Sequence, residues 1–143
     1  MNLDYLAFDK IEDNDFSEQN NVVYCGINEL LRKSDIISIH ISLSDETIGL
    51  LDANAFDKMK PTTIIINTSR GECINENALK RTLDANRIAG AGLDVYSDEP
   101  YSGSLIKYDN VITTPHIGSY AREIRMMMEM EAAENLIKGL AIG

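Results

Sequence analysis

Short apolar runs alternate with amphipathic segments along almost the whole chain, and this alternation most constrains the fold. The clearest run covers residues 62–67, where consecutive β-branched residues predict a buried strand. Near-continuous apolar strands separated by helical segments are typical of a parallel sheet. The pattern therefore predicts an α/β fold with helices on both faces of the sheet. Further strands are expected at residues 3–8, 22–24, 35–41, 89–96 and 111–114.

The segments between these runs predict helices. One is expected over residues 27–33, one begins at Asp52, and one runs over 75–86 with Asn75 as its N-cap. Residues 9–21 are the most polar stretch and predict an exposed loop. A long helix is expected from about Ser119, with its methionines filling the core. Its apolar stripe is predicted from residues that recur every four positions: Ile124, Met128, Ala132, Leu136 and Leu140.

Composition narrows the class of protein. The chain has 143 residues, of which 44% are hydrophobic, enough for one domain with a core. A net charge of −10 argues against nucleic acid or an anionic membrane as the main partner. No apolar run is long enough to span a membrane, and the first residues do not resemble a signal peptide. We expect a cytoplasmic protein.

The two cysteines, Cys25 and Cys73, are 48 positions apart. They form no Cys-x-x-Cys pair and belong to no cluster with the spacing of metal ligands. The sequence therefore predicts two reduced thiols without a functional role and no metal site.

Polar residues recur where the predicted strands end. In open α/β sheets, ligands bind beyond the carboxyl ends of the strands. The sequence therefore places a candidate site at that edge. The residues at or just after strand ends are Asp9, Ser42, Arg70, Asp94 and His116.

Three of the polar residues suit chemistry on a carboxylic acid. The guanidinium of Arg70 can hold a carboxylate through two parallel hydrogen bonds, although a surface ion pair is the alternative. The imidazole of His116 can give or take a proton near neutral pH. Glu99 stands seventeen residues earlier and can hold the tautomer of that imidazole, whereas a Glu-Pro pair alone would be only a turn.

Four motifs in this order resemble the D-isomer-specific 2-hydroxyacid dehydrogenases, and most of all their phosphoglycerate dehydrogenase branch. The resemblance implies NAD as cofactor and a small 2-hydroxy or 2-oxo acid as substrate, with hydride transfer between them. It covers residues from about 30 to 140. The motifs are Ser34-Asp35 with His40, Asn67 to Gly71, Leu93-Asp94-Val95 with Glu99-Pro100, and Pro115 to Gly118.

The resemblance also implies roles for single residues. Arg70 would orient the acid, and His116 with Glu99 would move the proton. Asp94 would contact the nicotinamide carboxamide, and Asp9 would bind the adenosine ribose hydroxyls and favour NAD over NADP. Ser42 stands where the family usually has a proline. The residues that would line the cofactor are Ile41, Thr68, Ser69, Gly118 and Ser119.

No Gly-x-Gly-x-x-Gly turn precedes these motifs. By this resemblance, residues 1–143 form a partial NAD-binding domain, an incomplete Rossmann-type doubly wound parallel sheet whose first strand and helix are missing. The substrate domain would be absent, and the isolated chain is expected to be inactive. Three arrangements could fill the vacant central position: the strand at 3–8, a second copy in a homodimer, or a segment of another chain.

A homodimer is expected because family members commonly pair through this domain. The alternative to an enzyme is a non-catalytic dimerisation or protein-interaction module derived from the family.

Overall fold

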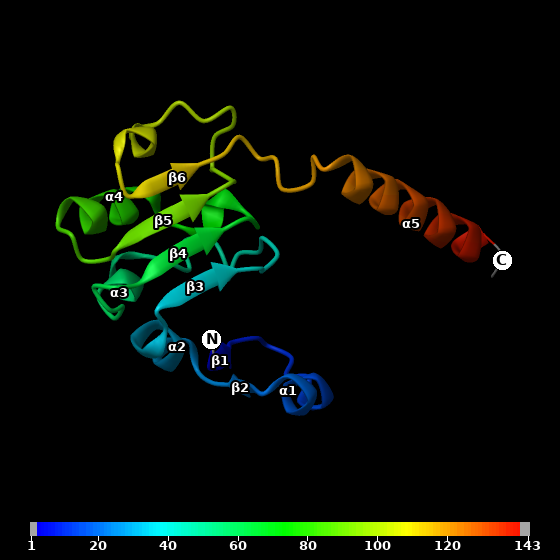
Figure 1. Ribbon diagram of the computed structural model, residues 1–143, viewed down its shortest axis with the longest axis horizontal. Coiled ribbons are helices and arrows are strands. Elements are labelled where there is room, and N and C mark those ends of the chain that lie inside the picture. The colour runs from blue at the N-terminus through cyan, green and yellow to red at the C-terminus, as the bar shows by residue number, and fades with distance from the viewer. Residues whose placement is uncertain (1–2, 141–143) are drawn as a thin grey trace.

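The computed structural model describes residues 3–140 and contains two parallel sheets (Figure 1). A two-stranded sheet pairs β1 with β2, and a four-stranded sheet has the order β3-β4-β5-β6. All pairs in both sheets are parallel, as predicted. The strands are β1 (Tyr5–Ala7), β2 (Val22–Tyr24), β3 (Ile36–Ile39), β4 (Ile64–Asn67), β5 (Gly90–Leu93) and β6 (Val111–Thr113).

The predicted helices form, with local caps that explain where they begin. The Asp52 carboxylate accepts from the N–H of Ala55, and the Asn75 side chain accepts from the N–H of Ala78, so both residues are N-caps. Two short 3₁₀ helices lie at η1 (Gly71–Cys73) and η2 (Ser104–Lys107). The α-helices are α1 (Asn14–Asn20), α2 (Ile27–Lys33), α3 (Ala53–Phe56), α4 (Glu76–Asp84) and α5 (Arg122–Leu140).

The core lies on one face of the four-stranded sheet. Ile37, Ile65 and Leu93 are buried there against Phe56 of α3 and Leu79 of α4. Side chains of alternate strand residues point to the other face, and there Ile36, Ile64 and Ile112 are 61%, 41% and 73% exposed. The prediction of helices on both faces is therefore wrong for the described residues, because no helix among them covers this second face.

Among the described residues, no strand of the two-stranded sheet pairs with a strand of the four-stranded sheet. In the doubly wound strand order 3-2-1-4-5-6, β2 and β1 take the places of strands 3 and 2, and β3 takes the place of strand 4. β1 pairs with β2 and not with β3, so it does not fill the first strand's place. An exposed ion pair between Lys10 and Glu46 joins the loops that follow β1 and β3.

Residues 9–21 contain a helix that the sequence interpretation missed. The Asp13 carboxylate accepts from the N–H of Phe16 at the start of α1, and Asn21 ends the helix in the left-handed conformation. Both are recognised helix-terminus signals. The helix buries no residue, so it has no apolar periodicity from which it could have been predicted.

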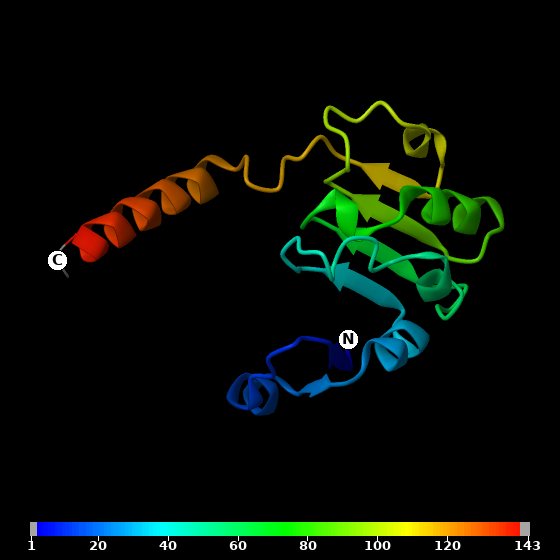
Figure 2. The same cartoon turned by 180° about the vertical axis from the view of Figure 1, so that it is seen from behind.

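The predicted packing of the last helix is wrong. α5 begins at Arg122, buries no residue, and extends away from both sheets in two opposite views (Figures 1 and 2). Residues spaced by four advance 40° around a helix at each step, because each residue turns it by about 100°. The series from Ile124 to Leu140 therefore spreads over about 160° of the helix surface instead of forming a narrow stripe. No helix of the described residues is long and apolar enough to cross a membrane.

Candidate active site

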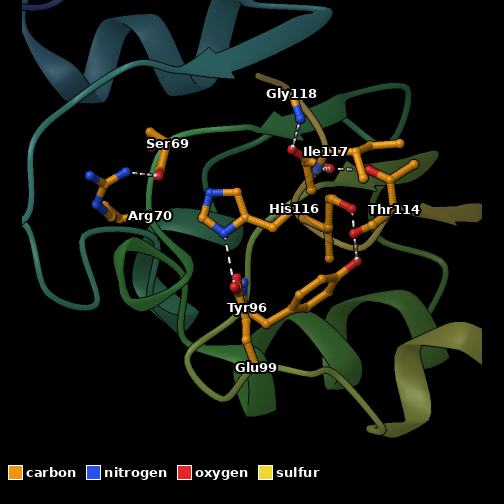
Figure 3. Close-up of polar contacts among 10 residues, drawn as sticks. Ser69, Arg70, Tyr96, Glu99, Thr114, His116, Ile117 and Gly118 are labelled. Atoms are coloured by element: carbon orange, nitrogen blue, oxygen red, sulfur yellow. Dashed lines mark hydrogen bonds and ion pairs between the residues drawn. The ribbon is translucent and has the colours of Figure 1, made fainter. Parts of the chain in front are cut away.

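The candidate site lies where β4, β5 and β6 end. Arg70 stands three residues after β4, Asp94 directly after β5, and His116 three residues after β6. Because the strands are parallel, these loops emerge at the same edge of the sheet. The close-up of this edge shows the side chains of Arg70, Glu99 and His116 near one another (Figure 3).

Asn67 shapes the turn that carries Arg70. This last residue of β4 is only 1% exposed. Its Nδ2 donates to the carbonyl of Arg70 at 2.9 Å, and its Oδ1 accepts from the N–H and the hydroxyl of Ser69 at 3.1 and 3.0 Å. The buried amide therefore fixes the turn from both ends.

Gly71 lets the Arg70 turn pack against the segment after β5. A Cβ at Gly71 would lie 2.1 Å from the carbonyl carbon and 2.4 Å from the Cα of Tyr96. Because these are backbone atoms, no rotation of a side chain can relieve the overlap. Glycine is required here by close approach of two backbone segments.

His116 and Glu99 form a pair across the site. The Nδ1 atom of His116 lies 2.8 Å from Oε2 of Glu99. An ionised carboxylate can only accept, so Nδ1 carries the hydrogen, and Nε2 of the neutral imidazole is left to accept a proton. In the close-up, Nε2 faces the side on which Ser69 and Arg70 lie (Figure 3).

Glu99 is itself held in place. Its Oε1 accepts from the backbone N–H of Tyr96 at 3.1 Å. The hydrogen bond to His116, followed by that from Tyr96, lowers the pKa of the Glu99 carboxyl. The carboxylate thus stays ionised and oriented toward the imidazole.

Asp94 anchors the loop that bears His116. One oxygen accepts from the hydroxyl of Thr114 at 2.5 Å and the N–H of Ile117 at 2.9 Å, and the other accepts from the N–H of Gly118 at 2.9 Å. Burial raises the pKa of this carboxyl, but the three hydrogen bonds outweigh burial and lower it. Asp94 is 7% exposed, so its oxygens face the loop and little else.

The anchored loop holds its histidine in an uncommon conformation. His116 has φ +55°, in the left-handed region that few residues other than glycine adopt. Tyr96 adds a second attachment, because its buried hydroxyl lies 2.8 Å from the carbonyl of Leu93 and 3.1 Å from that of Thr114. Both ends of the loop are therefore fixed to the segment after β5.

Arg70 borders an open cavity of about 470 Å³. Its guanidinium donates to the carbonyl of Ser69 at 2.7 Å and forms no ion pair within the described residues. Several of its N–H donors therefore remain for a ligand carboxylate. The cavity is lined by His40, Ile41, Ser42, Leu43, Ser69 and Arg70.

The residues predicted to bind the cofactor are spread along this edge. Asp9 is exposed two residues beyond β1, and its Oδ1 accepts from the N–H of Ile11 at 3.1 Å, which leaves its second oxygen for ribose hydroxyls. Thr68 and Ser119 are exposed, whereas Ile41 is half-buried. Exposed carboxylate and hydroxyl groups of this kind can form hydrogen bonds with ribose hydroxyls. The 143 residues contain no glycine-rich turn for the diphosphate.

Sequence reasoning gave no role to Asn67, Tyr96 and Thr114, which position the site. Asn67 carried a usable signal, because a polar residue at the end of a buried strand needs hydrogen-bond partners. Thr114 and Tyr96 carried none, since their partners come from other loops. Both cysteines are free, and burial raises the pKa of each thiol. Among residues 3–140, no group of three or more His, Cys, Asp or Glu is arranged to hold a metal ion.

Curated relatives share the sequence across nearly the whole chain. The D-3-phosphoglycerate dehydrogenase of Archaeoglobus fulgidus is 39% identical over 99% of this chain and 28% of its own length. The glyoxylate reductase of Korarchaeum cryptofilum is 40% identical over 92% of this chain and 40% of its own length. The chain thus spans well under half the length of these relatives.

Solved structures agree with the fold. An acyclic imino acid reductase in complex with NADPH and D-Arg has a TM-score of 0.85 at 34% identity, covering 96% of this chain and 43% of its own. The D-lactate dehydrogenase of Aquifex aeolicus, complexed with NAD and lactic acid, has a TM-score of 0.81 at 28% identity, covering 96% and 47%. Residues 1–118 match the NAD binding domain of the D-isomer specific 2-hydroxyacid dehydrogenases, and the chain belongs to that family.

Proposed function

We propose that these residues carry the acid-binding and proton-transfer part of an NAD-dependent oxidoreductase acting on 2-hydroxy or 2-oxo acids of the phosphoglycerate or glyoxylate type. The supporting observation is the His116–Glu99 pair, at 2.8 Å, at the same sheet edge as Arg70. The similarity to glyoxylate reductases and a phosphoglycerate dehydrogenase supports this substrate class.

Each side chain has a distinct task in this proposal. Arg70 holds the carboxylate of the acid, which places the oxygen on the neighbouring carbon near His116. NAD, when bound, supplies or accepts the hydride at that carbon. The Nε2 atom of His116 gives the proton to the oxygen during reduction and removes it during oxidation. Glu99 holds the imidazole through Nδ1, which leaves Nε2 for that proton.

Asp94 and Asp9 have supporting tasks. Asp94 positions the His116 loop through its three hydrogen bonds. Asp9 binds the ribose hydroxyls and favours NAD, because a carboxylate would repel the 2′-phosphate of NADP. The diphosphate has no glycine-rich turn among these residues, so we propose that residues 1–143 alone turn over little substrate.

Two assays test separately whether the isolated chain is inactive and whether its residues support catalysis in an intact enzyme. The first measures NADH oxidation by the 143-residue chain with glyoxylate and hydroxypyruvate. Robust turnover would contradict the proposed inactivity of the isolated chain. The second places residues 1–143 in the matching stretch of the Thermococcus litoralis glyoxylate reductase, which is 44% identical over 84% of this chain. This chimera is expected to reduce glyoxylate.

In the chimera, His116→Asn removes the proton-transferring group while keeping a residue that tolerates positive φ. We expect kcat to fall at least ~100-fold, as for loss of a general acid–base. Arg70→Lys is expected to lower kcat/KM, since an ammonium cannot form the paired hydrogen bonds of a guanidinium. Arg87→Lys is the control, because Arg87 forms an exposed ion pair with Asp57 away from the site. Equal activity of all three variants would contradict the assignment.

A second candidate function is a non-catalytic dimerisation or interaction module. The uncovered sheet face with Ile36, Ile64 and Ile112, together with the fully exposed α5, favours it. A stable dimer that shows no NADH binding by fluorescence and gives an inactive chimera would support this alternative over the enzyme.

A further inference from the structure

The segment that carries Glu99 has little packing of its own. Residues 97–100 are all exposed, between the buried Tyr96 and the half-buried Tyr101. The side chains of His116 and Glu99 are 51% and 35% exposed where they meet. An exposed charged pair contributes little by itself, because holding two free side chains in one geometry costs conformational entropy. The His116–Glu99 pair therefore depends on whatever fixes this segment.

Two stacked tyrosines close the segment. The rings of Tyr96 and Tyr101 lie with their centroids 4.0 Å apart and their planes inclined by 16°. Such aromatic pairs are stabilised beyond the burial of their surfaces. Tyr96 also donates its backbone N–H to Oε1 of Glu99 at 3.1 Å, and Figure 3 shows Tyr96 beside Glu99. The stack therefore joins the far end of the segment to the residue that holds the carboxylate.

Tyr101 is in turn tied to the core helix α4. Its hydroxyl donates to Oε1 of Glu76 at 2.9 Å and accepts from the N–H of Leu105 at 3.3 Å. Burial, with a smaller effect of the Glu76 carboxylate, raises the pKa of Tyr101 to about 12, so the hydroxyl keeps the proton that it donates. Glu76 is the first residue of α4, and Leu105 is only 1% exposed. Both hydrogen bonds therefore attach the ring to well-packed parts of the molecule.

We propose that Tyr101 is a positioning residue that holds Glu99 in reach of His116 through its stack on Tyr96. It acts through Glu99 and has no direct part in the chemistry. With Glu99 held in place, the imidazole keeps its hydrogen on Nδ1 and leaves Nε2 for the reacting proton. The effect of Tyr101 on catalysis rests on the proposed function, whereas its effect on the His116–Glu99 pair does not.

The tautomer of His116 measures this role in the 143-residue chain without any turnover. The ¹⁵N chemical shifts of the two imidazole nitrogens report which of them carries the hydrogen in the neutral ring, and the signals that disappear in His116→Asn identify the residue. Tyr101→Leu removes the stacked ring, so we expect the ratio of the Nδ1–H to the Nε2–H form to fall at least ~2-fold. Tyr101→Phe keeps the ring and should keep the ratio of the wild type.

Tyr108→Leu is the matched control. Tyr108 belongs to the same connection between β5 and β6, packs partly buried against the same core, and donates its hydroxyl to Asp84 at 2.8 Å. Its replacement removes a similar ring away from Glu99, so stability to urea should fall while the tautomer ratio stays the same. A merely structural role of Tyr101 would likewise lower stability without changing the tautomer.

Three tautomer results would overturn the proposal. The first is a wild-type ratio in Tyr101→Leu, and the second is an equal change in Tyr101→Leu and Tyr108→Leu. The third is a fall in Tyr101→Phe as large as in Tyr101→Leu, which would assign the effect to the hydroxyl contacts instead of the stack.

Kinetics of the glyoxylate reductase chimera give a second readout. Tyr101→Leu should lower kcat at least ~10-fold and change KM little, because a misplaced Glu99 impairs proton transfer while Arg70 still binds the acid. Tyr108→Leu should keep the activity of the parent chimera. An active chimera whose kcat is unchanged by Tyr101→Leu would overturn the positioning role. An inactive chimera would contradict the proposed function, whereas a changed tautomer in Tyr101→Leu would still support the role of Tyr101.

Discussion

The site at the end of β4, β5 and β6 and the helix α5 differ in how they are held. The His116 loop is attached at both ends by the side chains of Asp94 and Tyr96. α5 follows the same loop by a few residues but makes no buried contact in the described chain. The two segments are close in sequence, so what distinguishes them is that the loop has buried hydrogen-bond partners whereas the helix has no apolar surface packed against it.

The difference in stability between the four-stranded sheet and α5 should be most visible in native-state hydrogen exchange. Amides of β4 and β5 lie in the centre of the four-stranded sheet, so they should exchange through global unfolding, at ~5–15 kcal/mol. Amides of α5 in dilute protein should open at close to zero free energy, as fraying elements do. NMR or mass spectrometry would measure both. Equal protection of α5 and β4 in a monomer would contradict the comparison.

Among substitutions in the loops of the site, Gly71→Ala should cause the largest loss of stability. The new Cβ would overlap the backbone of Tyr96, so we expect a loss of about 3 kcal/mol or more in unfolding free energy, measured by urea denaturation. Gly92→Ala is the control in a neighbouring strand, because a Cβ there meets nothing within 4 Å. It should change stability by less than ~0.5 kcal/mol. Comparable losses in both variants would show that close approach is not the cause.

Asp94→Asn should weaken the His116 loop. Each carboxylate oxygen of Asp94 accepts a hydrogen bond from a backbone N–H. In either orientation the NH₂ group of asparagine would face one of these N–H groups, so at least one donor loses its acceptor. We expect a loss of about 1–3 kcal/mol, measured by urea denaturation. Thermal melting that matches the wild type would contradict the anchoring role.

The pH dependence of this variant gives a second measurement. Because the folded-state pKa of Asp94 lies below its ordinary 3.8, the wild-type stabilisation is present above that value and is lost as pH falls through the folded pKa. The Asn variant should lack this part of the acid dependence. Parallel stability curves for the two proteins between pH 5 and pH 2 would argue against it.

Gly139→Ala should have the smallest effect and should act on α5 alone. A Cβ there meets nothing within 4 Å, and alanine is favoured over glycine in a helix by about 0.5–1 kcal/mol. Circular dichroism should show more helix, while the urea midpoint of the sheet stays the same. A shifted midpoint would show that α5 folds together with the sheet.

Much of the fold could be predicted from local sequence. The β-branched run at 62–67, the cap at Asn75 and the helix at 27–33 each carry their own signal, and each element formed where it was expected. α1 was missed because its caps flank a segment without apolar periodicity. The uncovered sheet face could not be foreseen either, since an isoleucine in a strand does not reveal whether a helix lies over it.

The sequence by itself determined the family motifs, the parallel α/β class and the placement of Arg70, Asp94 and His116 at strand ends. Strand propensity and motif spacing are local properties, so they can be read along the chain. Only the tertiary structure decided that Asp94 anchors the His116 loop, that Gly71 meets the backbone of Tyr96, and that β1 does not pair with β3. The Asp94 and Gly71 contacts join residues more than twenty positions apart, and such contacts exist only when the backbone has brought the segments together.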